Sequence, residues 1–169
     1  MSVRTNAELF RRIPLFAECE DTHLQLLAFT SERRAFCQGE SIVRAGDAGH
    51  AGYLILSGGA DVWIEAGKTR KTVATIGPGA FVGELAMIAG LAYPANVTAK
   101  SEVAAMGVSR EVFMRVATEF PDFAIGIRRR LSERLDLSLA ELNRVRSLFE
   151  EVRSSRSGKV ERGQDGNMV

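Results

Sequence analysis

Short runs of alternating apolar and polar residues, separated by glycine-containing turns, fill the middle of the chain from about residue 31 to residue 110. Four of these runs recur at about ten-residue spacing: Ser41–Arg44, Gly52–Ser57, Ala60–Glu65 and Thr72–Ile76. The turns beside them read QGE, AGDAG, SGGA and GPGA. Strands of this length and rhythm favour an antiparallel sandwich or barrel over a parallel sheet.

Helical patterns flank this zone on both sides. Residues 5–30 predict short helices, with a break at Pro14 and a cap at Asp21-Thr22. Their apolar residues fall at helical spacing: Leu9, Ile13, Phe16, Leu24, Leu27 and Ala28. A short helix, Gly83–Ile88, is predicted as an insertion in the β zone.

After the β zone, Ser109 is a candidate N-cap for a helix that ends at Phe120-Pro121. A longer helix is predicted from Asp122 to Arg153, with one apolar stripe: Ile127, Leu131, Leu135, Leu139, Leu142 and Phe149. We therefore predict one domain over residues 5–153 and a disordered, polar tail over residues 154–169.

Composition excludes several classes of protein. The 169 residues suffice for one domain with a core, and a formal net charge of +1 gives no general argument for nucleic acid or membrane binding. No apolar run is long enough to span a bilayer, and the N-terminus lacks the apolar core of a signal peptide. Cys19 and Cys37 have no metal spacing and are interpreted as reduced thiols, so a cytoplasmic location is expected.

Catalytic motifs are missing from the sequence. His23 and His50 are the only histidines and form no metal-binding cluster, and no serine has a histidine at triad spacing. The basic run IRRRLSERLD, at residues 127–136, is interrupted by acidic residues and is interpreted as a solvated helix face rather than a DNA contact. We predict neither an enzyme nor a cofactor.

Three segments together resemble the cyclic nucleotide-binding domain family: IPLFAECEDTHLQLLA, FCQGESIVRAGDAGHAGYLILSGGADV and IGPGAFVGELAMIAG. The resemblance covers about residues 8–150. It implies an α+β fold, an eight-stranded antiparallel β-roll or jelly-roll with N-terminal helices, an inserted cassette helix and C-terminal helices. In that family the cassette helix directs backbone N–H groups at the cyclic phosphate.

The resemblance implies ligand-contacting positions in the cassette. Gly83 matches the family's cassette glycine, Glu84 its ribose-binding glutamate, and Leu85 and Ala86 the helical turn whose N–H groups face the phosphate. The candidate ligand-binding residues, if a ligand binds, are Gly83, Glu84, Leu85, Ala86, Tyr93, Pro94, Ala95 and Asn96.

The family's phosphate-binding arginine has no counterpart in this sequence. One spacing places Tyr93 at its position, the other places Pro94 there, and Asn96 stands where the family commonly has threonine. The Tyr93 hydroxyl offers one hydrogen bond to a ligand, or its ring fills the space of a nucleotide. Arg44 and Lys100 are interpreted as solvated or structural cations.

These residues predict a stand-alone regulatory domain with a diverged cassette, which does not bind cAMP or cGMP with the usual affinity. It would act through another small-molecule ligand in the β-roll or through a protein partner. Two alternatives remain: a working cAMP or cGMP sensor, and a β-roll enzyme. No DNA-binding domain and no membrane association are expected. Homodimerisation through the C-terminal helix is a further hypothesis, resting on Leu137, Val145 and Leu148.

Overall fold

The computed structural model describes the chain over residues 2–157, with side chains up to residue 136 and at several positions of the helix beyond. The chain divides into two units, the first ending at Ile127 and the second beginning at Arg128. No helix among the described residues is both long and apolar enough to cross a bilayer.

Three helices precede the sheets: α1 (Val3–Arg11), the 3₁₀ helix η1 (Pro14–Phe16) and α2 (Asp21–Thr30). Pro14 lies in the first turn of η1, where a backbone N–H would have no hydrogen-bond partner within the helix, so its absence costs nothing. The predicted cap at Asp21-Thr22 is wrong, because the N-cap is Glu20 and both residues lie inside α2. The predicted apolar face of α2 is confirmed, since Leu24, Leu27 and Ala28 are buried.

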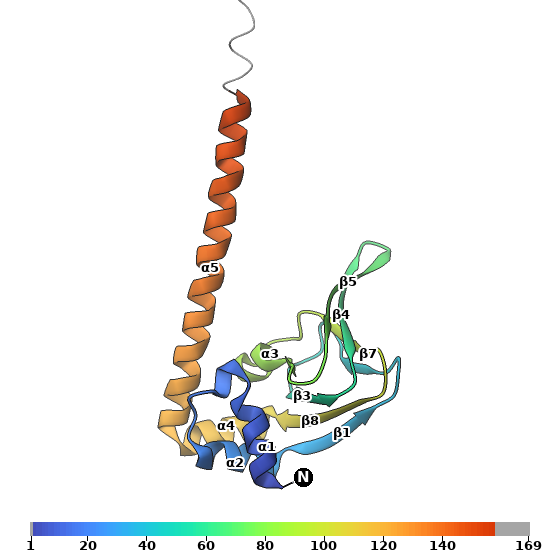
Figure 1. The fold of residues 1–169 in the computed structure, drawn as a ribbon, viewed down its shortest axis with the longest axis vertical. Coiled ribbons are helices and arrows are strands. Elements are labelled where there is room, and N and C mark those ends of the chain that lie inside the picture. The colour runs from blue at the N-terminus through green and yellow to red at the C-terminus, as the bar shows by residue number, and fades with distance from the viewer. Residues whose placement is uncertain (1, 158–169) are drawn as a thin grey trace, which may run out of the picture. The chain divides into compact units, whose positions relative to one another are not determined.

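Eight strands form two four-stranded antiparallel sheets. One sheet has the order β1-β8-β3-β6 and the other β2-β7-β4-β5. The strands are β1 (Glu32–Phe36), β2 (Ser41–Val43), β3 (Ala51–Ser57), β4 (Ala60–Ala66), β5 (Thr69–Ile76), β6 (Phe81–Val82), β7 (Asn96–Ala99) and β8 (Val103–Ser109). The predicted eight-stranded antiparallel roll is therefore confirmed (Figure 1).

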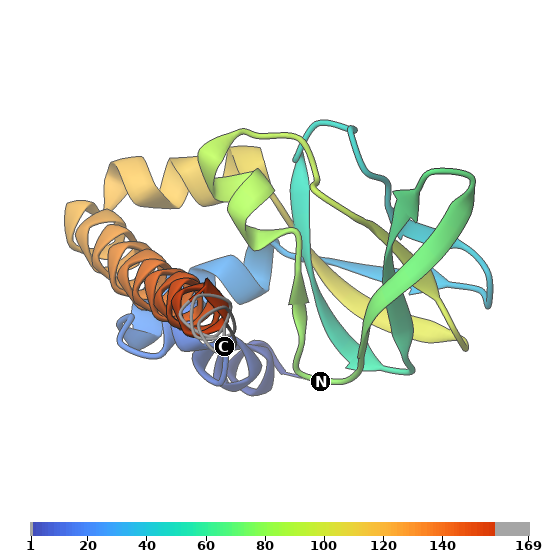
Figure 2. The ribbon, with the colours of Figure 1, turned by 90° about the horizontal axis from the view of Figure 1, so that it is seen from above.

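The two sheets face each other (Figure 2), and a cluster of buried apolar residues lies between them. Side chains from both sheets meet there, including Val43 and Val97 from one and Ile55 and Val103 from the other. Tyr93 belongs to this core, although it precedes the first residue of β7. A loop of residues 44–50 joins β2 in one sheet to β3 in the other and so closes this end of the roll.

Helix α3 (Glu84–Ala89) interrupts the β zone, as the sequence predicts. Helix α4 (Arg110–Glu119) follows β8, and the predicted N-cap is confirmed because Ser109 Oγ accepts a hydrogen bond of 3.1 Å from the Val112 N–H. Phe120 caps its C-terminus before Pro121, also as predicted.

Helix α5 (Pro121–Ser157) is longer than the predicted Asp122–Arg153. Residues 154–157, assigned to the predicted tail, are thus helical, and residues 158–169 lie outside the described part of the chain. Leu137, Val145 and Leu148 lie in this helix, but their side chains are outside the described ones. The first residues of α5 belong to the first unit, where Phe123 stacks on Phe16 with ring centroids 6.5 Å apart.

Candidate ligand-binding site

The cassette helix α3 is bounded by two glycines in the left-handed conformation. Gly83 is its N-cap with φ of 76°, and Gly90 is its C-cap with φ of 67°. Residues with a Cβ rarely adopt this conformation, so glycine is needed at both ends. The N–H groups of the first turn of a helix have no helical carbonyl to bind, and this is the general basis of anion binding at helix N-termini. With only six residues, α3 has a short dipole.

Tyr93 fills the space directly beside Gly83. Its side chain is buried, at 7% exposure, and a Cβ added to Gly83 would lie 2.7 Å from Cε1 of the Tyr93 ring. The hydroxyl donates a hydrogen bond of 2.6 Å to the Ala51 carbonyl and accepts one of 3.2 Å from the Ala51 N–H. The phenol therefore has its donor occupied by β3 and its ring packed on the cassette glycine.

Burial favours the neutral form of this phenol still further. Desolvation raises the pKa of Tyr93 above its ordinary value of 10.0, and the hydrogen bond from Ala51 opposes this only in part. The neutral hydroxyl is the form that donates to the Ala51 carbonyl, so the contact persists throughout the physiological pH range.

The same segment holds the loop that joins β2 to β3. The Tyr93 carbonyl accepts from the Gly46 N–H at 3.0 Å, and the Tyr93 N–H donates to the Asp47 carbonyl at 2.9 Å. Asn96 Oδ1 accepts a bond of 2.9 Å from the Ala45 N–H. Tyr93 and Asn96 thus tie the β2–β3 loop to the start of β7, through backbone and side chain alike.

The remaining candidate residues surround this pair. Ala86 is buried and the backbone of the β2–β3 loop lies close to it, because a Cβ at Gly49 would be 2.4 Å from the Ala86 carbonyl carbon. Glu84 is half-buried, and its side chain is not free of partners. Leu85 is 45% exposed. Pro94 is exposed and Ala95 half-buried. All the candidate residues lie in α3, at its N-cap or in the segment after it. Of the two residues that the resemblance aligns with the family's arginine, Tyr93 is buried and Pro94 is exposed.

A cavity of about 550 Å³ opens beside Tyr93. Its wall includes one cation, Arg44, together with Asp47 and His50. The other lining residues are Ser41, Ile42, Val43, Ala48, Ala51 and Tyr53. Arg44, interpreted from the sequence as a solvated or structural cation, is exposed, and so is His50. Sequence reasoning missed that the fold brings them to one cavity, because this depends on how the β2–β3 loop is folded back.

Arg110 is a structural residue that sequence reasoning missed. Its guanidinium donates to the carbonyl oxygens of Met87 and Ile88 at the C-terminal end of α3, the latter at 2.7 Å. Its backbone N–H donates to the His50 carbonyl at 2.7 Å. A cation at a helix C-terminus satisfies carbonyls that have no helical partner, so Arg110 anchors the cassette helix to the start of α4. The one sequence signal for Arg110 is that it directly follows Ser109, the predicted N-cap of α4.

Lys100 and His23 have structural partners instead. Lys100 is exposed and pairs with Asp61 at 3.7 Å. His23 is buried against Phe120, with ring centroids 4.5 Å apart. No group of three or more His, Cys, Asp or Glu residues is arranged to hold a metal ion in the described part of the chain.

Residues 33–120 match the profile of the family described as "Cyclic nucleotide-binding domain". A curated relative, the cyclic AMP receptor protein of Thermus thermophilus, is 28% identical over 142 residues, which cover 83% of this chain and 65% of the receptor. The chain covers only about a quarter of the cAMP-dependent protein kinase regulatory subunits that it also matches.

Solved structures give the same result. A cyclic nucleotide-binding-like protein from Brucella abortus is 29% identical with a TM-score of 0.62, covering 68% of this chain and 98% of that one. The regulatory subunit of a cAMP-independent protein kinase A from Trypanosoma brucei is 28% identical with a TM-score of 0.62, covering 78% of this chain and 47% of that one.

Proposed function

The chain belongs to the cyclic nucleotide-binding domain family, and from that premise we propose that it is a regulatory domain whose cassette has diverged from nucleotide capture. In this proposal it binds neither cAMP nor cGMP with the usual affinity of the family. It acts instead through a different small ligand or through a protein partner, without a cofactor and without catalysing a reaction.

The proposal rests on the position of Tyr93. A cyclic phosphodiester keeps one negative charge at physiological pH, and its burial requires a paired cation or several good donors. Removing one partner of a buried charge pair costs about 2–5 kcal/mol. At about 1.4 kcal/mol per decade, this lowers affinity by roughly thirty- to several-thousand-fold. A neutral phenol at this position therefore predicts weak binding at best.

The observation that carries the argument is the pair of hydrogen bonds between the Tyr93 hydroxyl and Ala51. A hydroxyl has one proton to donate, and this one is directed at the Ala51 carbonyl at 2.6 Å. A phosphate would have to break that bond to obtain a donor. The ring would also have to leave Gly83, since the two are in contact.

The first turn of α3 supplies the remaining attraction for an anion. Gly83, Glu84, Leu85 and Ala86 would keep the shape of a phosphate cassette, with backbone N–H groups at its start. The dipole contribution of such a terminus is about 0.3–1 kcal/mol, which does not replace a buried arginine. A similar regulatory subunit, from Trypanosoma brucei, belongs to a protein kinase A that is described as cAMP-independent.

Titration calorimetry of the full chain with cAMP and with cGMP tests the proposal. We expect no saturable binding in the low micromolar range for either nucleotide. Binding at low micromolar affinity or tighter contradicts the proposal directly. Because the Tyr93 contacts carry the argument, Tyr93→Phe serves as the matched variant: it keeps the ring against Gly83 and removes only the hydroxyl.

A working nucleotide sensor is the second candidate, and Arg44 is the observation that favours it. Its side chain lines the cavity beside Tyr93 and forms no ion pair among the described residues. In that case Arg44 would supply the missing cation. If the chain binds cAMP in calorimetry and Arg44→Ala lowers the affinity by about tenfold or more, this second function replaces the first.

Self-association through α5 completes the proposal. Leu135 and Leu139 are each 57% exposed, a large apolar surface for a solvated helix. Leu135, Leu139 and Leu142 follow at steps of four and three residues, which is the spacing of a coiled-coil seam. Leu137, Val145 and Leu148, on which the sequence-based hypothesis of a homodimer rests, lie in the same helix. We propose that two copies pair along this helix.

Sedimentation equilibrium of the full chain and of a chain ending at residue 136 tests the pairing. We expect a dimer for the full chain and a monomer for the shorter one. Leu135→Glu in the full chain provides a test that keeps the helix length. A monomer in every sample contradicts the proposed dimer without affecting the proposal on nucleotide binding.

A further inference from the structure

Strand β5 is the longest open edge of the two sheets. The four edge strands of the described sheets are β1, β6, β2 and β5, with five, two, three and eight residues respectively. Every residue of β5 from Thr69 to Thr75 is exposed, and no described strand pairs with its outer side. In an antiparallel ladder, every second N–H and C=O of such a strand points away from its partner. The edge therefore offers unpaired backbone donors and acceptors.

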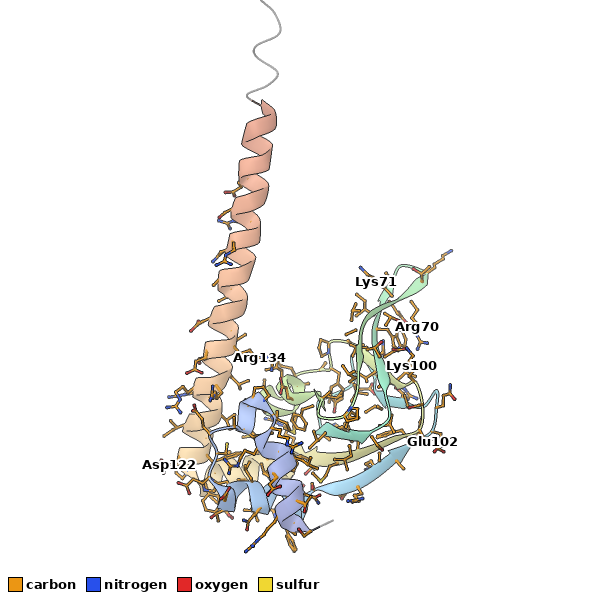
Figure 3. The ribbon with its side chains drawn as sticks, in the orientation of Figure 1. Arg70, Lys71, Lys100, Glu102, Asp122 and Arg134 are labelled. Atoms are coloured by element: carbon orange, nitrogen blue, oxygen red, sulfur yellow. The ribbon has the colours of Figure 1, made fainter. Side chains whose placement is uncertain are left out.

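The hairpin of β4 and β5 carries positive charge at this edge. Lys68, Arg70 and Lys71 follow within four residues, and the segment from Gly67 to Ile76 contains no acidic residue. None of the three cations forms an ion pair with a described carboxylate. Arg70 and Lys71 are adjacent on the strand and so face opposite sides of it, and Figure 3 places both on the projecting hairpin.

Arg70 is held in place by an aromatic ring. Its guanidinium carbon lies 3.5 Å from the centroid of the Trp63 ring on β4, and the Trp63 indole N–H donates to Thr98 Oγ1 at 2.9 Å. This stack restricts the arginine and leaves its charge in place, with the guanidinium over β4 on the inner side of β5. On the neighbouring positions, Ile64 and Val73 leave 37% and 50% of their surface exposed.

The regular part of the edge is short and defined. Residues Thr69–Thr72 pair with β4 in continuous register, and Val73 is the extra residue of a bulge, because Val62 pairs with Ala74 while Trp63 pairs with Thr72. A bulge disturbs further pairing beyond this point. The four regular residues include both cations, so the unpaired backbone groups and the positive charges lie in the same short segment.

We propose that the β5 edge, residues 69–72, binds an extended acidic segment of a partner protein as an added strand of this sheet. Main-chain hydrogen bonds would give affinity, and two adjacent acidic side chains of the partner would reach Arg70 on one face and Lys71 on the other. Flanking apolar side chains of the partner would cover Ile64 and Val73. This surface shares no residue with the cassette, so it stands apart from the nucleotide proposal.

Charge and backbone together select this occupant. A second copy of β5 would bring the same cations together, so self-pairing is opposed. Nucleic acid or an anionic bilayer would meet the positive charge but would leave the unpaired N–H and C=O groups of the strand without strand partners. The edge strand β1 provides the contrast, since it also carries two arginines, Arg33 and Arg34, but Arg34 pairs with Glu32 at 3.6 Å.

The probe is a capped eight-residue peptide with two central glutamates flanked by threonine and valine. We expect saturable binding, with amide shifts in the nitrogen–proton spectrum concentrated at residues 69–72 and increased protection of these amides from hydrogen exchange. The double variant Arg70→Glu/Lys71→Glu is expected to weaken binding by about tenfold or more at low salt, and raised salt should weaken binding to the original chain.

Three controls separate the proposal from general electrostatic attraction. Arg33→Glu/Arg34→Glu makes the same change in charge on another edge strand and should leave the affinity within about threefold. A peptide with lysines in place of the glutamates, and a glutamate peptide N-methylated at alternate amides, should each lose binding. Thermal melts check that both variants are folded. No saturable binding, amide shifts outside β5, or equal binding of the N-methylated peptide overturns the proposal.

Discussion

Replacing Tyr93 with arginine tests whether the rest of the cassette is intact. The side chain at this position lies beside the N-cap glycine of α3, and one spacing of the family resemblance aligns it with the phosphate-binding arginine. A buried charge pair recovers about 2–5 kcal/mol, so Tyr93→Arg is expected to raise the affinity for cAMP by roughly thirty- to several-thousand-fold. The gain should appear for cAMP and cGMP together, because both carry the same cyclic phosphate.

The same change has a cost in stability. It removes the two hydrogen bonds between the Tyr93 hydroxyl and the Ala51 backbone, each worth about 1 kcal/mol. It also removes the ring packed on Gly83, for which the arginine stem compensates in part. We expect the variant to lose about 2–3 kcal/mol of unfolding free energy without ligand and to regain stability as nucleotide is added.

Two matched variants isolate the cause. Tyr93→Phe shares the lost hydrogen bonds but gains no charge, so it should lose about 1–2 kcal/mol of stability and gain no affinity. Tyr93→Lys gains a charge without the planar fork and should gain less affinity than the arginine variant. Calorimetry measures affinity and urea titration measures stability. A folded Tyr93→Arg variant without any gain in affinity would refute the reasoning, because the missing cation would then not be the defect.

Two further predictions concern the same contacts. Gly83→Ala should destabilise the fold by at least about 1 kcal/mol more than Gly79→Ala, as measured by urea titration. Both glycines have a positive φ, of 76° and 90°, but of the two only Gly83 has an aromatic ring where the added Cβ would lie. Equal losses for the two variants would contradict this prediction. Burial raises the pKa of Tyr93 above 10.0, so the folded chain holds this proton longer than the unfolded chain. Its contribution to stability is therefore complete below pH 10.0 and is lost as pH rises through the folded pKa, and Tyr93→Phe should show a shallower loss above pH 10.0.

The order of elements was predictable because it depends on local patterns. Glycine-bounded runs of alternating polarity located β2 to β5 within three residues at each end, and Ser109 marked the start of α4. Strands β1 and β8 were harder to find, since β1 is mostly exposed and reads ERRAF, while β8 is mostly buried and reads VAAMGVS. Neither shows the strict alternation that identifies a half-buried strand.

The role of Tyr93 was only half predictable. The sequence shows that residues 83–99 contain no arginine, and it shows the size of the tyrosine ring. The hydroxyl contact with Ala51 is not, because the partners are 42 residues apart and the partner atoms belong to the backbone, which carries no residue-type signal. The same limit applies to Arg110, whose partners are the carbonyl oxygens of Met87 and Ile88.

Tyr93 and Asn96 both fix the β2–β3 loop or its junction with β3. Tyr93 bonds Gly46 and Asp47 in the loop through its backbone and Ala51, the first residue of β3, through its hydroxyl. Asn96 bonds Ala45 in the loop through its side chain. Groups that share one loop act as a unit, so their substitutions are not expected to add. We predict that Tyr93→Phe and Asn96→Thr together cost less stability than the sum of the single variants, with a difference of about 0.5 kcal/mol or more, since the first release already loosens what the second would free. Urea titration of the two single variants and the double variant measures this difference. Additive losses would mean that each residue holds its part of the loop alone, and an arginine at residue 93 could then be accommodated without a further change at Asn96.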